Sequence, residues 1–379
     1  MTRPLRVAMI GLRAPWGTEG GVEATVAQLA PRLVDRGCDV TVYCRRRYNS
    51  LGEGLHDGVR LVDVDTVYTK HLEAIVHTAL ATPRAIPSAD LIHIHATGPS
   101  LMSWMPRLAR RPCVVTLHGL DWQRAKWGRA ARLALRLGAR AAATFPDELI
   151  AVGAHLQSHY VERYNVRPHW IPNGVSAIPE HPLEDGDVSD LVSRQYLLYV
   201  GRLVPEKGLE RLMAAYAVSG VRMPLVIVGG ATHMDAFRER LHALAPAGVR
   251  LVGPRYGGAR DALLNHARAF VLPSHVEGFP LAALEAMAAG LPVLLSEIPP
   301  HRELLSGCPE AGWIVEDTRW ADQLRLISET SWETLAARGA RGRAHVTERY
   351  SWDRIAEQTL SVYQTALQKH RGKNTADGL

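Results

Sequence analysis

The chain has 379 residues, of which 47% are hydrophobic and 22% charged, with 44 Lys and Arg against 38 Asp and Glu. The length suits two domains, and the composition is that of a globular enzyme instead of a disordered or fibrous chain. No apolar run approaches the roughly 20 residues that span a bilayer. None of the four cysteines forms a C-x-x-C pair, so the sequence indicates neither a zinc site nor a redox motif. We expect a cytoplasmic protein.

Short β-rich runs alternate with helical stretches in the first half of the chain. The first run, Leu5–Ile10, precedes a helical stretch from Val22 to Arg36, and we interpret it as a core strand instead of a signal peptide. The later predicted strands are Asp39–Cys44, Asp90–His95, Cys113–Leu117 and Glu148–Val152. Their nearly continuous apolar runs are typical of strands that are covered on both faces. The alternation predicts a parallel sheet with helices on both sides.

An acidic segment with prolines, residues 176–190, lacks apolar periodicity and reads as a linker. It separates an N-terminal domain, 1–175, from a C-terminal domain, 191–350. The strand pattern restarts at Gln195–Val200, Pro224–Val228, Arg250–Val252, Ala269–Pro273 and Pro292–Ser296. The last segment, 351–379, is predicted to hold a helix from Ser351 to His370 and a polar tail after Lys373.

The positive charge lies in the first half of the chain. Residues 1–175 hold 22 Lys and Arg against 14 Asp and Glu, a balance of +8, and the remainder has a balance of −2. Between Trp122 and Arg140, Trp, Arg, Lys and Leu mix in a helical pattern, as in helices that lie on a membrane surface. We expect either a peripheral contact with an anionic membrane or a solvated basic face. No nucleic-acid partner is expected, because no binding motif accompanies the charge.

Two glutamates eight residues apart, Glu277 and Glu285, flank a predicted loop-to-helix junction. The residues of the junction are Gly278, Phe279, Pro280 and Leu281. The backbone N–H groups of a first helical turn attract an anion. Two carboxylates with a phosphate seat between them therefore suit a nucleotide-sugar. For an isolated pair, a loop acid next to a solvated helix acid would be the simpler interpretation.

Three other segments follow predicted strands. Gly20 and Gly21 open a helix after the first strand, where glycine lets backbone N–H groups approach a phosphate closely. His118 comes directly after Cys113–Leu117. Arg202 and Lys207 follow Gln195–Val200 and could neutralise a diphosphate. The glycines could also form a plain turn, and Arg202 and Lys207 an exposed charged turn. A histidine in the position of His118, taken alone, more often has no functional role.

Glu206 sits between two of these cationic positions and reads as a surface acid.

Four segments in this order resemble the motifs of the retaining GT-B glycosyltransferases of family 4, the glycosyl transferases group 1. They are T-E-G-G-V-E from Thr18, H-G-L-D from His118, G-R-L-V-P-E-K-G from Gly201 and the segment Pro273–Val293. The resemblance runs from about Arg6 to about Tyr363. It implies an α/β fold of two Rossmann-like parallel-sheet domains that face a central cleft. The N-terminal domain would bind the acceptor and the C-terminal domain the nucleotide-sugar, and the final helix would cross back to the N-terminal domain.

The resemblance also implies a role for each candidate residue. The matching catalytic positions are His118, Arg202, Lys207 and Glu277, and the matching donor-binding positions are Gly20, Gly21, Gly278, Phe279, Pro280, Leu281 and Glu285. His118 would contact the transferred sugar, and Glu277 would hold its hydroxyls. Arg202 and Lys207 would bind the diphosphate, and Glu285 the ribose. Pro280 stands where many relatives have glycine, and it removes one N–H donor.

The implied activity is retaining transfer of a hexosyl or deoxyhexosyl group from a UDP-, dTDP- or GDP-linked donor. The acceptor would be a glycan or a lipid-linked molecule in polysaccharide, glycolipid or glycoconjugate biosynthesis. We expect no metal and no other cofactor, because Arg202, Lys207 and a helix N-terminus can stabilise the leaving diphosphate. A nucleotide-sugar epimerase of the same architecture remains the alternative. An inactive lipid-binding scaffold is disfavoured by the complete set of charged motif positions. The lack of G-x-G-x-x-G after the first strand disfavours an NAD-dependent dehydrogenase.

Overall fold

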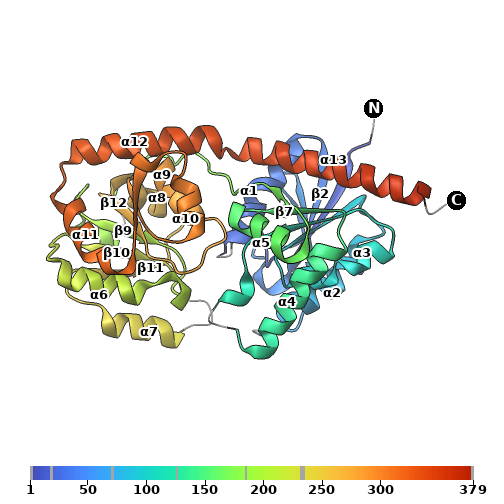
Figure 1. Ribbon diagram of the computed structural model, residues 1–379, viewed down its shortest axis with the longest axis horizontal. Helices are drawn as coiled ribbons and strands as arrows, with labels where there is room; N and C mark the ends of the chain where they lie inside the picture. Colours follow the sequence, from blue (N-terminus) through green and yellow to red (C-terminus); the bar gives the residue numbers. More distant parts are fainter. Residues whose placement is uncertain are drawn as a thin grey trace. The chain divides into compact units, whose positions relative to one another are not determined.

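The computed structural model describes residues 3–17, 20–69, 72–124, 127–183, 186–230 and 235–376. The chain forms two compact units (Figure 1). The first unit comprises the residues up to Asn173 and those from Trp352 onward, and the second comprises Gly174–Ser351. Residues 176–190, expected as a linker, are grouped with the second unit, and their described part contains the short 3-10 helix Gly186–Val188.

The described part of the first unit contains one sheet of eight strands in the order β3-β4-β2-β1-β5-β6-β7-β8. The strands are β1 (Leu5–Ile10), β2 (Cys38–Arg45), β3 (Gly54–His56), β4 (Val59–Val64), β5 (Leu91–His95), β6 (Cys113–Leu117), β7 (Glu148–Ala151) and β8 (His169–Trp170). All neighbours pair in parallel except β3 and β4. The parallel sheet predicted from the apolar runs is therefore confirmed.

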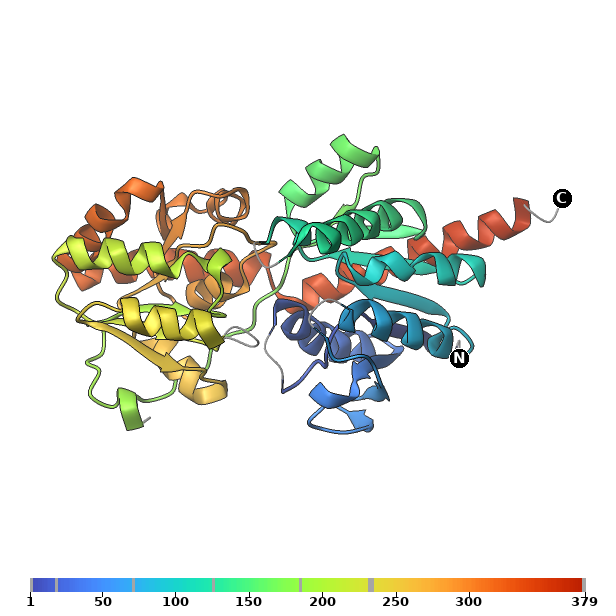
Figure 2. The same ribbon diagram turned by 90° about the horizontal axis from the view of Figure 1, so that it is seen from below.

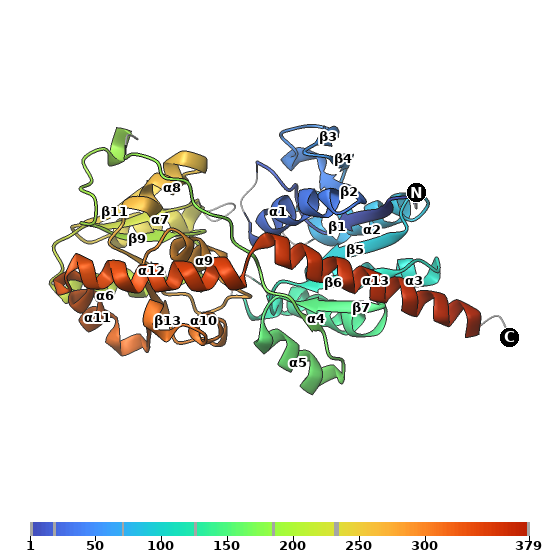
Figure 3. The ribbon, with the colours of Figure 1, turned by 90° about the horizontal axis from the view of Figure 1, so that it is seen from above.

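Helices cover this sheet on both sides. They are α1 (Gly21–Asp35), α2 (Glu73–Ala85), α3 (Trp104–Leu108), α4 (Arg129–Thr144), α5 (Ala154–Tyr164) and α13 (Trp352–Ala376). The last of these, α13, lies beside α1 and against β6 and β7 (Figure 3). The expected return of the final helix to the first domain is confirmed. This helix ends at Ala376, beyond the predicted end at His370, and no proline interrupts its hydrogen bonds before that point.

The described part of the second unit contains a parallel sheet of six strands in the order β11-β10-β9-β12-β13-β14. The strands are β9 (Leu197–Val200), β10 (Leu225–Val228), β11 (Val249–Gly253), β12 (Ala269–Leu272), β13 (Val293–Ser296) and β14 (Gly312–Val315). The helices are α6 (Leu209–Ser219), α7 (Asp235–Leu244), α8 (Gly257–His266), α9 (Leu281–Ala288), α10 (Pro299–Leu305), α11 (Trp320–Glu329) and α12 (Trp332–Arg349). Figure 2 shows α6 and α7 side by side, in yellow-green and yellow.

The order of this sheet decides which loops are neighbours. In a parallel sheet the carboxyl ends of all strands lie at one edge, which is where open α/β sheets bind ligands. Because β9 pairs with β12, the loops that follow these two strands meet at that edge. Gly208 explains how closely they approach: its φ is +68°, and a Cβ there would come within 2.2 Å of the carbonyl oxygen of Pro273. Only glycine fits this position without a shift of the backbone.

Candidate functional site

An ion pair joins the loop after β9 to the loop after β12. The ammonium group of Lys207 donates a hydrogen bond to Oε1 of Glu277. The same oxygen accepts a hydrogen bond of 2.7 Å from the hydroxyl of Ser274. The side chains of Lys207 and Glu277 are only 15% and 12% exposed. Two residues that the sequence analysis assigned to the diphosphate and to the donor sugar are thus direct partners.

Glu277 is held in its ionised form. Burial opposes ionisation of this carboxyl, but the charge of Lys207, with His301 nearby and the hydrogen bonds from Lys207 and Ser274, keeps its pKa below the ordinary value. An ionised carboxylate accepts hydrogen bonds and donates none. Glu277 is therefore suited to hold hydroxyl groups and poorly suited to act as a general acid.

A buried histidine, His301, lies near this carboxylate. Burial lowers the pKa of His301 to about 4, so its ring is neutral near pH 7. Its Nδ1 lies 2.8 Å from the carbonyl oxygen of Ser296, to which it can donate. The hydroxyl of Ser296 donates in turn to the carbonyl oxygen of Ser274. This network fixes the loop after β12 to the end of β13.

The loop after β9 carries Arg202 and Glu206. The carbonyl oxygen of Arg202 accepts a hydrogen bond of 3.0 Å from the hydroxyl of Tyr199, which anchors the turn on the strand. The interpretation of Glu206 as a surface acid was wrong, because its side chain is only 6% exposed. Its backbone carbonyl accepts from the N–H of His275 at 2.8 Å, so the turn folds inward onto the neighbouring loop. Neither carboxylate oxygen of Glu206 has a hydrogen-bond partner within the described residues.

Glu285 lies on α9 and pairs with Arg260 on α8. The distance between Arg260 Nη1 and Glu285 Oε1 is 3.0 Å, and Arg260 also donates to Asp261 at 2.8 Å. Burial raises the pKa of Glu285, and the charge of Arg260 opposes that rise. Sequence reasoning missed Arg260, because its partner lies 25 residues further along the chain and no motif marks the position.

The helix that carries Glu285 begins at Leu281. Pro280 is its N-cap, and the carbonyl oxygen of Pro280 accepts hydrogen bonds of 3.1 Å from the N–H groups of Ala283 and Leu284. The ring of Phe279 is buried and packs 5.5 Å from the ring of Tyr350. The N–H groups of Leu281 and Ala282, which come before Ala283 and Leu284, have no acceptor within the helix itself. They can serve an anion at the same edge of the sheet as Lys207.

Gly20 and Gly21 open α1 in the first unit. Gly20 is the N-cap with a φ of +157°, and a Cβ there would lie 1.9 Å from Oε2 of Glu23. The carboxylate of Glu23 therefore folds back over this turn, where its Oε1 accepts the N–H of Arg13 at 3.2 Å. The N-terminus of a helix carries partial positive charge and attracts an anion. Here the carboxylate of Glu23 is that anion, in place of a phosphate. A phosphate would have to displace Glu23. Thr18 and Glu19 of this motif lie outside the described residues.

His118 follows β6 and is partly exposed. Its Nε2 lies 3.1 Å from Nδ1 of His95, the last residue of β5. Burial lowers the pKa of His118 to about 4; the charge of Asp121 works against this shift and that of Arg124 adds to it. His118 is therefore neutral near pH 7. The contact with His95 was not anticipated from the sequence, although L-I-H-I-H placed two histidines on one face of a strand.

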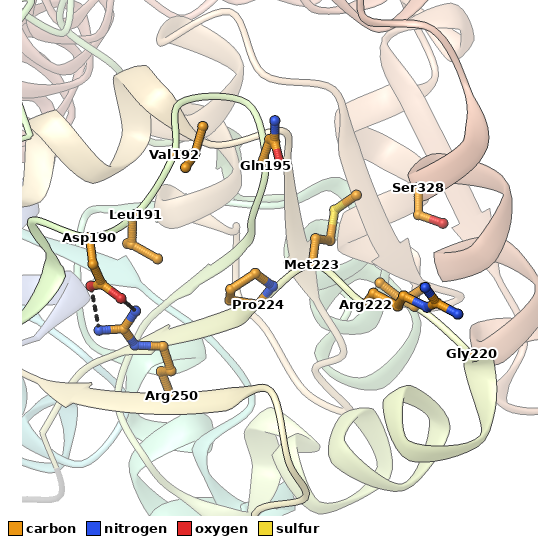
Figure 4. A pocket seen from close by; sticks show the side chains of 11 residues that line it. Asp190, Leu191, Val192, Gln195, Gly220, Arg222, Met223, Pro224, Arg250 and Ser328 are labelled. Carbon is orange, nitrogen blue, oxygen red and sulfur yellow. Dashed lines mark hydrogen bonds and ion pairs between the residues drawn. The ribbon is translucent and has the colours of Figure 1, made fainter.

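A cavity of about 490 Å³ lies at the other end of the second sheet (Figure 4). Gln195 and Pro224, which precede β9 and β10, are among its lining residues, together with Asp190 and Arg250. Asp190 and Arg250 form a two-fold ion pair with both distances 2.9 Å. The cavity is at the amino ends of the strands, whereas the candidate site residues follow their carboxyl ends. It is separate from the candidate site.

Two family models match the chain, each over one of the two halves. The model of Glycosyltransferase Family 4 matches residues 19–177, and the model of Glycosyl transferases group 1 matches residues 189–343. The chain belongs to this glycosyltransferase family. The matches contain all the motif positions discussed above, from Gly20 to Glu285.

Curated relatives and solved structures align with nearly the whole length of this glycosyltransferase. The α-maltose-1-phosphate synthase of Mycolicibacterium smegmatis is 27% identical over 95% of this chain and 99% of its own length. A D-inositol 3-phosphate glycosyltransferase of Acidothermus cellulolyticus is 29% identical over 97% of this chain and 92% of its own. Sucrose-phosphate synthase from Thermosynechococcus elongatus superposes with a TM-score of 0.81 at 21% identity, covering 95% of this chain and 98% of that one. The Anabaena protein HepE, solved with UDP and glucose, gives 0.78 at 19% identity, covering 95% and 100%.

These structures establish the GT-B fold of the glycosyltransferase. No helix within the described ranges is both long and apolar enough to cross a membrane. In the same ranges, no group of three or more His, Cys, Asp or Glu side chains is arranged to hold a metal ion.

Proposed function

We propose that this glycosyltransferase transfers a hexosyl or deoxyhexosyl group from a nucleoside-diphosphate sugar with retention of the anomeric configuration and without a metal ion. The observation that carries the proposal is the ion pair of Lys207 and Glu277, which places a cation beside an ionised acid between the loops after β9 and β12. A diphosphate needs cations, and a sugar needs acceptors for its hydroxyl groups. This edge of the second sheet supplies both kinds of group.

The nucleotide half of the donor is assigned to α8 and α9. Arg260 fixes the carboxylate of Glu285 through Oε1, which leaves lone pairs of that carboxylate available for the two ribose hydroxyls. The donor nucleotide is proposed to be UDP, dTDP or GDP. Two structures of HepE, one in complex with UDP and one with UDP-glucose, support a uridine nucleotide as the first of these to test.

The chemistry follows from charge. As the sugar–phosphate bond breaks, negative charge grows on the leaving diphosphate, and Arg202, Lys207 and the first turn of α9 are placed at one sheet edge to stabilise it. Preorganised cations of this kind take the place that a metal ion has in other enzymes. The acceptor oxygen attacks from the face that the diphosphate leaves, and a phosphate oxygen takes its proton. No covalent sugar–enzyme intermediate is part of the proposal, because Glu277 is assigned to the hydroxyl groups of the sugar and not to its anomeric carbon.

The acceptor is proposed to be a glycan or a lipid-linked molecule. The relatives' names include a maltose-1-phosphate synthase, an inositol 3-phosphate glycosyltransferase and a phosphatidyl-myo-inositol mannosyltransferase. Phosphorylated and lipid-linked compounds are therefore the first acceptors to assay. His118 is proposed to donate a hydrogen bond to an oxygen of the reacting sugars.

We also propose that the first unit binds the surface of an anionic membrane on the cytoplasmic side. Helix α4 exposes Arg129, Arg132, Arg136 and Arg140, and the exposed Leu133 and Leu137 lie beside them at helical spacing. The helix contains no acidic residue. An arginine row beside apolar side chains is the composition of helices that lie in the interface of a bilayer.

The central test is a donor screen on the purified chain. UDP, dTDP and GDP are added separately, and the shift of thermal unfolding is measured; a nucleotide at 100 times its dissociation constant adds about 2.7 kcal/mol of stability. The sugar conjugates of the nucleotide that binds are then assayed for transfer, with and without EDTA. We expect transfer that EDTA does not abolish and a product that keeps the anomeric configuration of the donor.

Two outcomes would contradict the proposal. An isomerised sugar formed from the donor alone would show an epimerase, and a product of inverted configuration would exclude retention. Lys207→Ala is expected to slow transfer by about a hundredfold or more. The matched control is Arg250→Ala, which removes a cation of the separate cavity at the amino ends of the strands and should leave transfer unchanged.

A further inference from the structure

Four polar side chains line one face of the first sheet near the carboxyl ends of β5 and β6. Side chains two residues apart in a strand point to the same face, so His93 and His95 share a face of β5. His95 pairs with Thr116 in the register of the two strands, and His118 follows two residues later. The four residues therefore form a continuous polar row inside an otherwise apolar core.

The row is connected by direct contacts. The hydroxyl of Tyr363 on α13 lies 2.7 Å from Nδ1 of His93, and Nε2 of His93 lies 2.7 Å from the hydroxyl of Thr116. The rings of His93 and His95 have centroids 4.0 Å apart. Nδ1 of His95 lies 3.1 Å from Nε2 of His118. Only the last contact reaches a side chain that is partly exposed.

All three imidazoles are neutral near pH 7. Burial lowers the pKa of His93 to about 3 and that of His118 to about 4, and it moves the pKa of His95 in the same direction. The charged groups that act on His118 are Asp121 and Arg124. A neutral imidazole carries one N–H and one acceptor nitrogen. In the contact between His95 and His118, one ring must therefore donate and the other accept.

The surroundings of His95 decide which of the two rings donates the hydrogen bond. Its Nε2 is buried and has no hydrogen-bond partner in the part of the chain that the structure describes. A proton on that nitrogen would be an orphaned buried N–H, which folded proteins avoid more strictly than an unused acceptor. The proton of His95 therefore belongs on Nδ1, from which it points at Nε2 of His118. His118 then accepts through Nε2 and carries its own proton on Nδ1.

We propose that His95 is a positioning residue that fixes His118 as the Nδ1–H tautomer, so that His118 presents a hydrogen-bond donor, and not a base, to the reacting sugar. The identity of the sugar as the recipient rests on the proposed function, whereas the tautomer does not. The Nδ1 atom of His118 is not among the buried polar atoms that lack a partner, and no partner for it occurs among the described residues, so it is open to a ligand.

The turns that carry the two histidines are held firmly. Ala96, directly after His95, has a φ of +75°, a conformation that non-glycine residues adopt only where the surroundings impose it. The hydroxyl of Thr97 donates to the carbonyl oxygen of Gly119 at 3.2 Å, which ties the turn after β5 to the turn after β6. Gly138 of α4 packs against the backbone of Thr97, since a Cβ at Gly138 would lie 2.2 Å from the carbonyl oxygen of Thr97.

The tautomer can be read without any substrate. The full chain is labelled with ¹⁵N-histidine, and two-bond correlations between ring nitrogens and ring carbons distinguish the Nδ1–H from the Nε2–H form. His118→Asn and His95→Asn variants assign the two rings among the 17 histidines. We expect both His95 and His118 in the Nδ1–H form at neutral pH. An Nε2–H form of His118 overturns the proposal, because His118 would then donate to His95.

Two substitutions of His95 separate positioning from packing. In His95→Asn the amide nitrogen can occupy nearly the position of Nδ1 and donate to His118, whereas His95→Leu fills the space without a donor. We expect His95→Leu to shift His118 toward the Nε2–H form and to lower kcat at least about tenfold, as loss of a donor in an active site does. His95→Asn should keep the tautomer and recover most of kcat.

The readouts keep this inference distinct from the proposed function. UDP binding, measured as a thermal shift, should be the same in wild type and both variants, which also shows that the variants fold. If the tautomer is as expected and no sugar transfer is found, the proposed function fails and the assignment of His95 stands. If His95→Leu leaves the tautomer and kcat of an active enzyme unchanged, the positioning role of His95 is refuted.

Discussion

The ammonium group of Lys207 donates to the carboxylate of Glu277, although 70 residues of the chain separate them. Each side chain is the partner that lets the other stay nearly buried and charged. The pair lies where the two central strands β9 and β12 end. It links the two loops that follow these strands, and it supplies a cation and an anion to which a donor can bind. In a ligand that carries both a diphosphate and hydroxyl groups, the diphosphate can bind Lys207 and the hydroxyl groups can bind Glu277.

Breaking this pair should cost stability as well as activity. Lys207→Met leaves the carboxylate of Glu277 nearly buried without its cation, and removing one partner of a buried pair costs about 3 kcal/mol or more. Lys207→Met already removes the ion pair. Adding Glu277→Gln to that variant should therefore lower the free energy of unfolding much less than Glu277→Gln does alone. Urea unfolding of the two single variants and the double variant measures this coupling. Additive losses would show that the two side chains do not stabilise each other.

The same Lys207→Met variant should lose turnover by about a hundredfold to a thousandfold, the usual effect of removing one preorganised group from an active site. The measurement is kcat with the donor that the nucleotide screen identifies. Arg240→Met serves as the control, because it also breaks an ion pair, with Glu210, but on α7 and at an exposed position. Normal turnover of Lys207→Met would remove this residue from the site.

Arg260 should control how strongly a nucleotide binds and how that binding depends on pH. In Arg260→Gln the carboxylate of Glu285 loses its cation, so its pKa, already raised by burial, should rise further. A hydrogen bond to a charged acceptor contributes about 1.5–3 kcal/mol, so UDP affinity should fall about tenfold or more. In both proteins affinity should decrease as pH falls through the pKa of Glu285, and the decrease should begin at higher pH in the variant.

Isothermal titration of UDP into wild type, Arg260→Gln and Glu285→Gln between about pH 5 and about pH 8 tests this dependence. In Glu285→Gln the contribution of this carboxylate should be absent, which leaves only the pH dependence of the terminal phosphate of UDP, whose second pKa is about 6. If Arg260→Gln follows the same curve as wild type, the carboxylate of Glu285 does not touch the nucleotide.

Buried neutral histidines should make the protein sensitive to mild acid. The pKa of His301 is lowered from 6.5 to about 4, and that of His93 to about 3. As pH falls below 6.5 the unfolded chain takes up a proton at each of these positions, and the folded chain does not until pH approaches the lowered value. Stability is therefore lost as pH falls through this window, by about 1.4 kcal/mol per pH unit for each such histidine.

The free energy of unfolding, measured by urea at several pH values across that window, checks the slope. In His301→Asn the amide can still donate to the carbonyl oxygen of Ser296, and the slope should decrease by about one proton. An unchanged slope would mean that His301 takes up its proton equally in the folded and unfolded chains.

The exposed arginines of α4 should bind anionic vesicles. Arg132→Gln combined with Arg136→Gln should weaken sedimentation with phosphatidylglycerol vesicles, by about 1 kcal/mol for each arginine removed at low salt. The control is Arg238→Gln with Arg240→Gln, which removes the same charge from exposed positions of α7. If the two double variants bind anionic vesicles equally, the membrane contact does not involve the arginines of α4. If the protein binds anionic and neutral vesicles equally, it has no specific contact with an anionic membrane.

Much of the fold follows from local patterns in the sequence. The central strands, such as β9, β10 and β12, are continuous apolar runs between turn residues, and those runs predicted them. The edge strands β3 and β8 have three residues and two residues, too short for any periodicity to show. The strand β4 alternates exposed and buried residues only in part, and its place in the sheet depends on pairing with β2.

The candidate site was predictable as a set of positions but not as a set of contacts. The motifs named Lys207, Glu277 and Glu285, because each follows or flanks a strand end in a charged, glycine-containing segment. That Lys207 pairs with Glu277 follows from the adjacency of β9 and β12, which is a property of the sheet order. Arg260 and His95 carry no local signal, because each gains its role from one distant partner.

The second unit is an insertion into the first, and its two ends meet. The N–H of Val175 donates to the carbonyl oxygen of Tyr350 at 2.7 Å, and Val175 pairs with Ser351 as an isolated bridge. Residues 174–351 therefore hold the whole six-stranded second sheet, whereas the first unit also includes α13, which follows them in the chain. Tyr363 of that helix, which contacts His93, follows the whole inserted unit in the chain. A chain truncated before Trp352 would therefore keep the second sheet intact, and the first unit would lack the helix that packs against α1, β6 and β7.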